Sequence, residues 1–333
     1  MSTLGWDGIG PRRGSAVLIL PRTGPDRNGS GPSRRNANIP VSFRMYAPLS
    51  SVNLRALCGS LCTMNLYDAH NHLQDERFGG TQAERVSEAR AAGVVRMVVN
   101  GSCADDWPQV ADLARRFPDL VIPSFGLHPW YVPERKDDWR EQLARWLDTP
   151  GAVVGEIGLD RWKPDLPWDG QEEAFVFQMD EAATRNAPVS IHCLQAWGRL
   201  VELLEQFPRP ACGFVLHSYG GSEDLIDRLA PLGAYFSLPG YYAHERKARQ
   251  RDVFRHVPPD RLLIETDAPD QLLPPDRQSH PLTGPDGKPL NHPANLAAVY
   301  AFAAELLGQE PAALTARVEQ NFQRVFGRRD LPV

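Results

Sequence analysis

Short apolar runs and amphipathic stretches alternate along the chain from Leu66 almost to its end. A short apolar run bounded by turn residues predicts a buried strand, whereas apolar positions spaced three and four residues apart predict a helix. On this pattern we expect eight strands, at residues 66–72, 94–100, 121–126, 152–156, 189–192, 213–217, 234–238 and 262–267.

Helical patterns fill the intervals between these strands. The first opens on Thr81-Gln-Ala-Glu84, the spacing of a capping box, in which two side chains bond free backbone N–H groups at a helix start. Eight strand–helix units in about 270 residues match a (β/α)₈ TIM-like barrel, with a doubly wound open sheet as the alternative. The helices are expected at residues 81–92, 106–117, 137–147, 171–186, 196–207, 222–229, 245–256 and 294–307, with a last one at 311–326.

Residues 1–63 have a different composition from the rest of the chain. They are rich in Gly, Pro, Ser, Asn and Arg, with one short apolar run at 16–20. Such a segment buries too little apolar surface to offset its ordering entropy, so we expect a disordered leader before a barrel domain at 64–330. An Arg-rich, acid-poor leader is also typical of an organelle transit peptide. Because Met64 directly precedes the first strand, our hypothesis is that translation begins there or that the leader is dispensable.

Charge is distributed unevenly between these two regions. Residues 1–63 carry eight Arg and two Asp, a net charge of +6, whereas the rest carries 28 basic and 39 acidic residues, a net charge of −11. A protein that grips a long duplex usually presents a strongly basic face. Any nucleic-acid substrate is therefore expected to be short, an end, or held mainly by metal ions.

The remaining composition narrows the class of protein. The chain is 42% hydrophobic and 23% charged, which is ordinary for a globular enzyme, and its five cysteines are scattered without a Cys-x-x-Cys pair. It has no run of about 18 apolar residues, which a membrane span needs, and no secretory signal before Met64. We expect a cytoplasmic enzyme that does not contact a membrane and has no evident obligate protein partner.

Candidate chemistry begins in the first strand, at Leu-Tyr-Asp-Ala-His-Asn-His-Leu from Leu66. His70 and His72 share one face of an extended strand about 6.6 Å apart along the backbone, so both imidazoles can reach one ion. Paired histidines alone are weak evidence, since they also occur as ordinary surface or core residues.

Further ligand-type residues end other predicted strands. Barrel active sites lie at the carboxyl ends of the strands, where these side chains would meet. The long segment 270–293 follows the last strand and suits a substrate-binding lid on the same face. The candidate metal ligands are His70, His72, Glu156, His192, His217 and Asp267.

Four imidazoles and two carboxylates suffice for two divalent ions. We assign His70, His72 and Asp267 to one ion, His192 and His217 to the other, and Glu156 to both. Two such ions polarise a phosphoryl oxygen, activate a water and stabilise the leaving oxygen, so an anionic substrate is expected. Asp267 and Glu156 are the candidate catalytic carboxylates, with Asp267 accepting the proton of the water. Ligand type allows Zn²⁺, Mn²⁺ or Mg²⁺.

Two further residues are candidates for substrate contact. His128, in Gly-Leu-His-Pro at the end of the third strand, either lines the pocket or ligates an ion. Tyr219 follows His217 by two residues and either stacks on a base or sugar of the substrate or packs in the core.

With these motifs in order, the sequence resembles the TatD family of metal-dependent hydrolases, within the amidohydrolase-like superfamily. The resemblance covers residue 66 to about residue 326, and includes Gly-Glu-Ile-Gly-Leu-Asp from Gly155, Glu-Thr-Asp-Ala-Pro from Glu265 and Asn-His-Pro-Ala-Asn-Leu from Asn291. It implies a TIM-like barrel, a binuclear metal centre and deoxyribonuclease activity. The family's ligands then fall on the same six residues.

Three residues depart from the family pattern at positions where we expect contact with the substrate. Leu194 stands where an Arg is common, Asp270 where an aromatic is common, and His292 where an acidic residue is frequent. A phosphodiesterase acting on short or single-stranded DNA or a nucleotide is therefore weighed against an amidohydrolase that cuts a C–N or carboxylic ester bond in a small metabolite. Glu156 stands where many such amidohydrolases have a bridging lysine, and Lys163 lies beyond the strand. A binding module without catalysis is the third alternative.

Overall fold

The computed structural model describes residues 64–327. The predictions for residues 1–63 fall outside this range.

Eight strands form one sheet in the order of the sequence, each parallel to its neighbours. The ring is completed by backbone hydrogen bonds between the ends of the last and first strands: Asp267 N–H donates to the His70 carbonyl at 2.9 Å, and His72 N–H to the Ala268 carbonyl at 2.7 Å. The expected (β/α)₈ barrel is therefore confirmed. The strands are β1 Leu66–Asn71, β2 Val94–Asn100, β3 Val121–Phe125, β4 Val153–Asp160, β5 Val189–Leu194, β6 Phe214–Leu216, β7 Ala234–Pro239 and β8 Leu262–Glu265.

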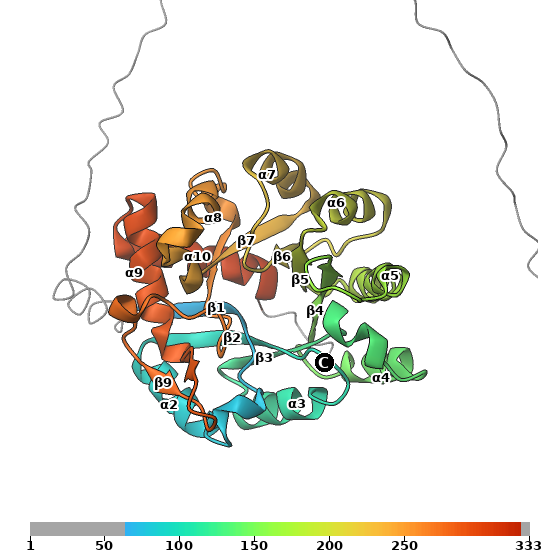
Figure 1. Cartoon of the computed structure of the whole chain (residues 1–333), viewed down its shortest axis with the longest axis horizontal. Helices are drawn as coiled ribbons and strands as arrows, with labels where there is room; N and C mark the ends of the chain where they lie inside the picture. Colours follow the sequence, from blue (N-terminus) through green and yellow to red (C-terminus); the bar gives the residue numbers. More distant parts are fainter. Residues whose placement is uncertain (1–63, 328–333) are drawn as a thin grey trace, which may run out of the picture. The chain divides into compact units, whose positions relative to one another are not determined.

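Helices surround this ring of strands (Figure 1). Their apolar faces and the outward faces of the strands form one continuous core. The last helix differs, because Phe322 and Phe326 pack with Tyr67 and Val98 of the strands in a separate cluster. The helices are α2 Gln82–Ala91, α3 Trp107–Arg116, α4 Trp139–Trp146, α5 Trp168–Arg185, α6 Trp197–Gln206, α7 Glu223–Leu229, α8 Ala248–Val253, α9 Leu296–Leu307 and α10 Pro311–Phe326.

Several boundaries differ from the sequence prediction. Thr81 does not form a capping box, because its hydroxyl donates to the Phe78 carbonyl at 2.6 Å and no side-chain cap bond forms at the start of α2. The helix expected at 245–256 is divided into a 3₁₀ turn, Glu245–Lys247, and the short α8. The segment 270–293 is not only a loop, since it contains the two-stranded ribbon of β9 Leu282–Thr283 and β10 Pro289–Leu290.

The largest correction concerns β4, which continues to Asp160 instead of ending at Glu156. Ile157 and Leu159 pair with Ile191 and Cys193 of β5, and both are fully buried. Gly158 lies opposite His192 in this register. A Cβ atom on Gly158 would lie 2.0 Å from the His192 carbonyl oxygen, and the residue has a φ of +153°. Only glycine permits this approach, so the glycine continues the strand and does not end it.

We predict that Gly158→Ala lowers the free energy of unfolding by about 2 kcal/mol or more, because the added methyl group forces β4 away from β5. The matched control is Gly151→Ala, which also has a positive φ, +75°, but has no neighbouring atom within 4 Å of the added Cβ. Urea unfolding of both variants separates steric overlap from backbone strain. Equal losses of stability in the two variants would contradict the close approach of β4 to β5.

Candidate metal centre

The barrel brings the six candidate ligands together at one end. His70 lies in β1, Glu156 in β4 and His192 in β5. His72 and His217 directly follow β1 and β6, and Asp267 lies two residues after β8. Glu156 lies in the middle of its strand, contrary to the prediction that it ends one. All six side chains are buried or nearly so.

The first group of ligand atoms surrounds one oxygen of Glu156. Its Oε2 lies 3.4 Å from His70 Nε2 and 3.2 Å from His72 Nε2, and the two nitrogens lie 3.2 Å apart. Asp267 Oδ1 lies 3.6 and 3.5 Å from the same two nitrogens. Four ligands about 2.0–2.2 Å from a tetrahedral ion are separated by about 3.3–3.6 Å from one another. The atoms of His70, His72 and Glu156 are therefore close enough to hold one cation, and His70 also lies within ligand distance of Asp267 and His217.

The second group surrounds the other oxygen of Glu156. Its Oε1 lies 2.8 Å from His217 Nε2 and 3.3 Å from His192 Nδ1, and these two nitrogens lie 3.5 Å apart. One carboxylate thus presents one oxygen to each group, which is the arrangement of a bridging ligand.

Hydrogen bonds behind the imidazoles fix which nitrogen faces the ligand groups. His70 Nδ1 lies 2.7 Å from Ser190 Oγ, and His72 Nδ1 lies 2.7 Å from the Asn100 carbonyl oxygen. The Asn100 carbonyl can only accept, so His72 carries its proton on Nδ1 and has its lone pair on Nε2. The Ser190 hydroxyl can accept from His70 in the same way, which would leave His70 Nε2 to bind a metal.

His192 is also held by a hydrogen bond from one ring nitrogen, but here the bonded nitrogen is Nε2 and not Nδ1. Its Nε2 lies 3.0 Å from Asp160 Oδ2, which leaves Nδ1 free to ligate. Sequence reasoning gave no role to Asp160 or Ser190. The position of Asp160 at the end of Gly-Glu-Ile-Gly-Leu-Asp was the only available signal.

His128 lies beside the second group, with Nε2 3.4 Å from Glu156 Oε1. However, its Nδ1 accepts a hydrogen bond from Trp130 N–H at 3.2 Å. A neutral imidazole whose Nδ1 accepts carries its proton on Nε2, which is then a donor and not a metal ligand. The ligand atoms of His128, Glu156 and His192 are close enough to share a cation, but the hydrogen bond from Trp130 favours the other role that the sequence left open, a hydrogen-bond donor that faces the pocket.

Burial and the charges of neighbouring ligands shift the pKa values of the candidate ligands. Burial, with the neighbouring His217 charge, lowers the pKa of His70 to about 4, so this imidazole is in the neutral form that ligates. Burial by itself raises the pKa of the Glu156 carboxyl, but the surrounding imidazoles, His217 first, hold it well below its usual range. Burial raises the pKa of Asp267 despite the opposing charges of His217 and His72. Cations that bind here would displace the protons that these groups share.

Tyr219 is a correction to the substrate-side prediction. Its ring is fully buried and packs edge-on against Trp197 and Phe236, and its hydroxyl donates to the Ser222 carbonyl at 2.7 Å. The side chain belongs to the core between β6 and the helices, so it has no surface on which a substrate could stack.

The carboxylate of Asp270, at the rim of the centre, is already paired. Arg77 donates to its two oxygens at 2.9 and 2.7 Å, and the same guanidinium binds Asp75. Asp270 therefore joins the loop after β8 to the turn after β1. This pairing offsets the negative charge that Asp270 would otherwise present to a polyanion.

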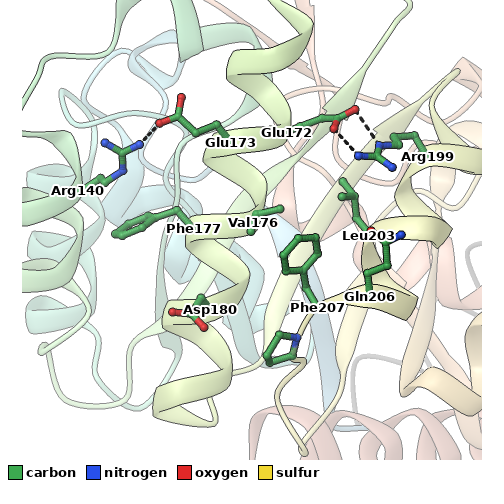
Figure 2. A pocket seen from close by; sticks show the side chains of 11 residues that line it. Arg140, Glu172, Glu173, Val176, Phe177, Asp180, Arg199, Leu203, Gln206 and Phe207 are labelled. Carbon is green, nitrogen blue, oxygen red and sulfur yellow. Dashed lines mark hydrogen bonds and ion pairs between the residues drawn. The ribbon is translucent and has the colours of Figure 1, made fainter. Parts of the chain in front are cut away.

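A groove of about 580 Å³ lies on the outer wall of the barrel, away from these ligands. Figure 2 shows it between α5 and α6, with Phe207 and Val176 beside it. Its charges are largely satisfied, because Arg199 pairs with Glu172 and Arg140 pairs with Glu173. None of the candidate ligands lines it, so the chemistry is assigned to the barrel end.

Comparison with known proteins gives a consistent result. Residues 67–327 match the family model described as TatD related DNase. The chain is 32% identical over 263 residues to the 3′-5′ ssDNA/RNA exonuclease TatD of Edwardsiella piscicida, covering 78% of this chain and 99% of that protein. It is 31% identical over 264 residues to the protein of the same name from Escherichia fergusonii, covering 79% and 99%.

Solved structures agree with the fold. The TatD homologue YJJV from Escherichia coli K12 has a TM-score of 0.71 at 26% identity, covering 79% of this chain and 98% of that one. A TatD family hydrolase from Entamoeba histolytica has a TM-score of 0.69 at 17% identity, covering 78% and 97%, and supports the fold alone. Within residues 64–327, no helix is both long and apolar enough to cross a membrane.

We predict that Ser190→Ala lowers the affinity for metal about 10- to 100-fold, because His70 loses the acceptor that fixes its Nδ1 proton. Ser124→Ala is the matched control, since Ser124 is also buried in the barrel but donates to the Gly155 carbonyl and to no imidazole. Competition with a fluorescent chelator measures both affinities. An equal loss in the two variants would mean that Ser190 supports the fold and not the ligand.

Proposed function

The chain belongs to the TatD-related DNase family, and on this premise we propose that it is a metal-dependent hydrolase that cleaves phosphodiester bonds in short or single-stranded nucleic acid. The observation that carries the proposal is the buried Glu156 carboxylate, which presents one oxygen to each of two groups of imidazole and carboxylate ligands. The names of the relatives agree with this substrate class.

We assign one divalent ion to His70, His72, Asp267 and Glu156, and a second to His192, His217 and Glu156. When bound, such a pair polarises the phosphoryl oxygen, lowers the pKa of the attacking water and stabilises the leaving oxygen. Imidazoles and carboxylates without a thiolate are compatible with Zn²⁺, Mn²⁺ or Mg²⁺.

Asp267 is the proposed proton acceptor. Its Oδ1 faces His70 and His72, while its Oδ2 accepts from Gln271 Nε2 at 2.7 Å, which fixes the plane of the carboxylate. In this position the ionised carboxylate can accept a proton from a water that attacks the substrate. His128 Nε2–H, 3.4 Å from Glu156 Oε1 beside the second ligand group, is the proposed donor to an oxygen of the substrate.

The field of the centre is not strongly positive. Besides Glu156 and Asp267, the carboxylates of Asp160 and Glu265 are buried directly behind His192 and His217. These four carboxylates balance the charge of two divalent cations. Long-range attraction of an anion is therefore weak, and an anionic substrate must be held by direct contacts with the ions and with neighbouring side chains.

The small-metabolite amidohydrolase is not favoured. Its usual bridging lysine has no counterpart here, because Glu156 joins the two groups and Lys163 is exposed beyond the end of β4. The relatives are named as nucleases, which points in the same direction.

We predict that chelation abolishes cleavage of a 3′-labelled single-stranded oligonucleotide and that Mg²⁺, Mn²⁺ or Zn²⁺ restores it. Asp267→Asn should lower kcat by about 100-fold or more, because the amide cannot accept the proton of the water. Asp270→Asn is the matched control, since this neighbouring carboxylate is paired with Arg77 outside the ligand groups. Cleavage by Asp267→Asn at the wild-type rate would refute the role of Asp267. No cleavage by the metal-loaded wild type would refute the proposed function.

We also predict that two neighbouring histidines differ in what their removal does to metal content. His192→Ala should lose one of the two bound ions, whereas His128→Ala should keep both and lower the rate, because its Nε2 carries a proton. Elemental analysis of the purified variants measures the number of ions per chain. Loss of an ion from His128→Ala would instead make His128 a ligand.

A further inference from the structure

Exposed aromatic surface gathers beside the second ligand group. Among residues 64–327, the exposed large hydrophobic side chains are Tyr131, Trp162, Leu194 and Phe207, and Trp162 is the most exposed at 59%. Tyr131 follows β3, Trp162 follows β4 and Leu194 ends β5, so three of the four lie at the barrel end that holds the centre. A large aromatic that remains in water at an active site points to a ligand that covers it.

Trp130 and Trp162 form a pair close to the metal ligands. The two rings lie 6.5 Å apart between centroids, with 28° between their planes. The Trp130 ring lies 5.3 Å from the His128 ring and 6.3 Å from the His192 ring. Lys163 Nζ lies 4.8 Å from the centre of the Trp130 ring. We call Trp130, Trp162 and Lys163 the aromatic ledge.

One carboxylate holds the aromatic ledge and a metal ligand together. Asp160 Oδ2 accepts from Trp130 Nε1 at 2.7 Å and faces His192 Nε2 at 3.0 Å. Its Oδ1 accepts from the backbone N–H groups of Trp162 at 2.6 Å and Lys163 at 2.9 Å. The position of the ledge relative to the second ligand group is thus fixed by hydrogen bonds, although Trp162 itself is exposed.

We propose that the aromatic ledge is a stacking subsite for the nucleobase of the nucleotide next to the scissile bond. This inference rests on the proposed function. Aromatic rings beside a lysine are the combination by which proteins bind single strands, because every base has a face that can stack and a cation attracts the backbone. In an acidic protein whose centre is nearly neutral, stacking supplies affinity that charge does not.

Two properties of the reaction follow from this subsite. A base can reach the ledge only when it is unstacked, so single strands are cleaved in preference to duplexes, with little preference among bases. Stacking involves no counterion release, so the part of the affinity that Trp162 contributes should change little with salt concentration, whereas the part that Lys163 contributes should fall as salt is added.

The test compares a single-stranded oligonucleotide with the same oligonucleotide carrying an abasic terminal nucleotide. For the metal-loaded wild type, we expect kcat/KM to be about 5- to 150-fold higher with the base present, mainly through KM. In Trp162→Ala this ratio should fall toward one, and Trp162→Phe should recover part of it. Because the side chain is mostly exposed, Trp162→Ala should fold normally, which circular dichroism checks.

Phe207→Ala is the matched control. Phe207 is also an exposed aromatic, at 37%, but it lies in the groove between α5 and α6, away from the centre (Figure 2). This variant should keep the wild-type ratio. A wild-type ratio in Trp162→Ala, or an equal fall in Phe207→Ala, would overturn the subsite.

A binding measurement separates failure of the subsite from failure of the function. A phosphorothioate single strand resists hydrolysis, and its binding to the metal-loaded chain should quench tryptophan fluorescence in the wild type more than in Trp162→Ala. Cleavage of both oligonucleotides at equal kcat/KM would refute the subsite and leave the function intact. Quenching that requires Trp162, without cleavage by the wild type, would refute the function and leave the subsite intact. Neither binding nor cleavage would refute both.

Discussion

The structure depends on one buried carboxylate. Glu156 is only 3% exposed in the middle of β4, and a charge at such a depth is costly unless it is paired. Its two oxygens are met by imidazole nitrogens from β1, from β5 and from the segments after β1 and β6. A closed barrel allows this, because it brings strands far apart in the sequence around one axis. The same carboxylate explains why two ligand groups lie side by side and do not form two separate sites.

Residues on neighbouring strands orient the metal ligands through hydrogen bonds. Ser190 of β5 orients His70 of β1, and Asp160 at the end of β4 orients His192 of β5. Asp160 also holds Trp130 and the backbone at Trp162, so the metal ligands and the aromatic ledge share one support. The close approach at Gly158 sets the register of β4 against β5, on which these contacts rely. Fold stability and site geometry are therefore difficult to separate in this part of the barrel.

Recognition of a polyanion by an acidic barrel needs a source of affinity other than net charge. The residues after position 63 carry a net charge of −11, and four buried carboxylates offset the charge of the proposed ions. Asp270 adds little further repulsion, because Arg77 binds both of its oxygens. Leu194, where a cationic side chain was expected from the family resemblance, is exposed at the same barrel end as the ledge. These features together favour recognition of the substrate through coordination of its phosphate by the ions and stacking of a base at the end of the nucleic-acid strand.

The sequence by itself determined the barrel, because alternating strand and helix periods are local properties of the chain. It also identified His70, His72, His192, His217, Glu156 and Asp267 as ligand candidates, since their chemistry and their positions in or near strand ends can be read from the motifs. Tertiary structure decided the rest. Packing against β5 extended β4 past Glu156, and core contacts buried Tyr219. The hydrogen bond from Trp130 determined the proton position on His128, and the convergence of Trp130, His192 and Trp162 on Asp160 created the ledge. A sequence pattern gives the face and type of a side chain, whereas its partners come from segments that only the closed barrel brings together.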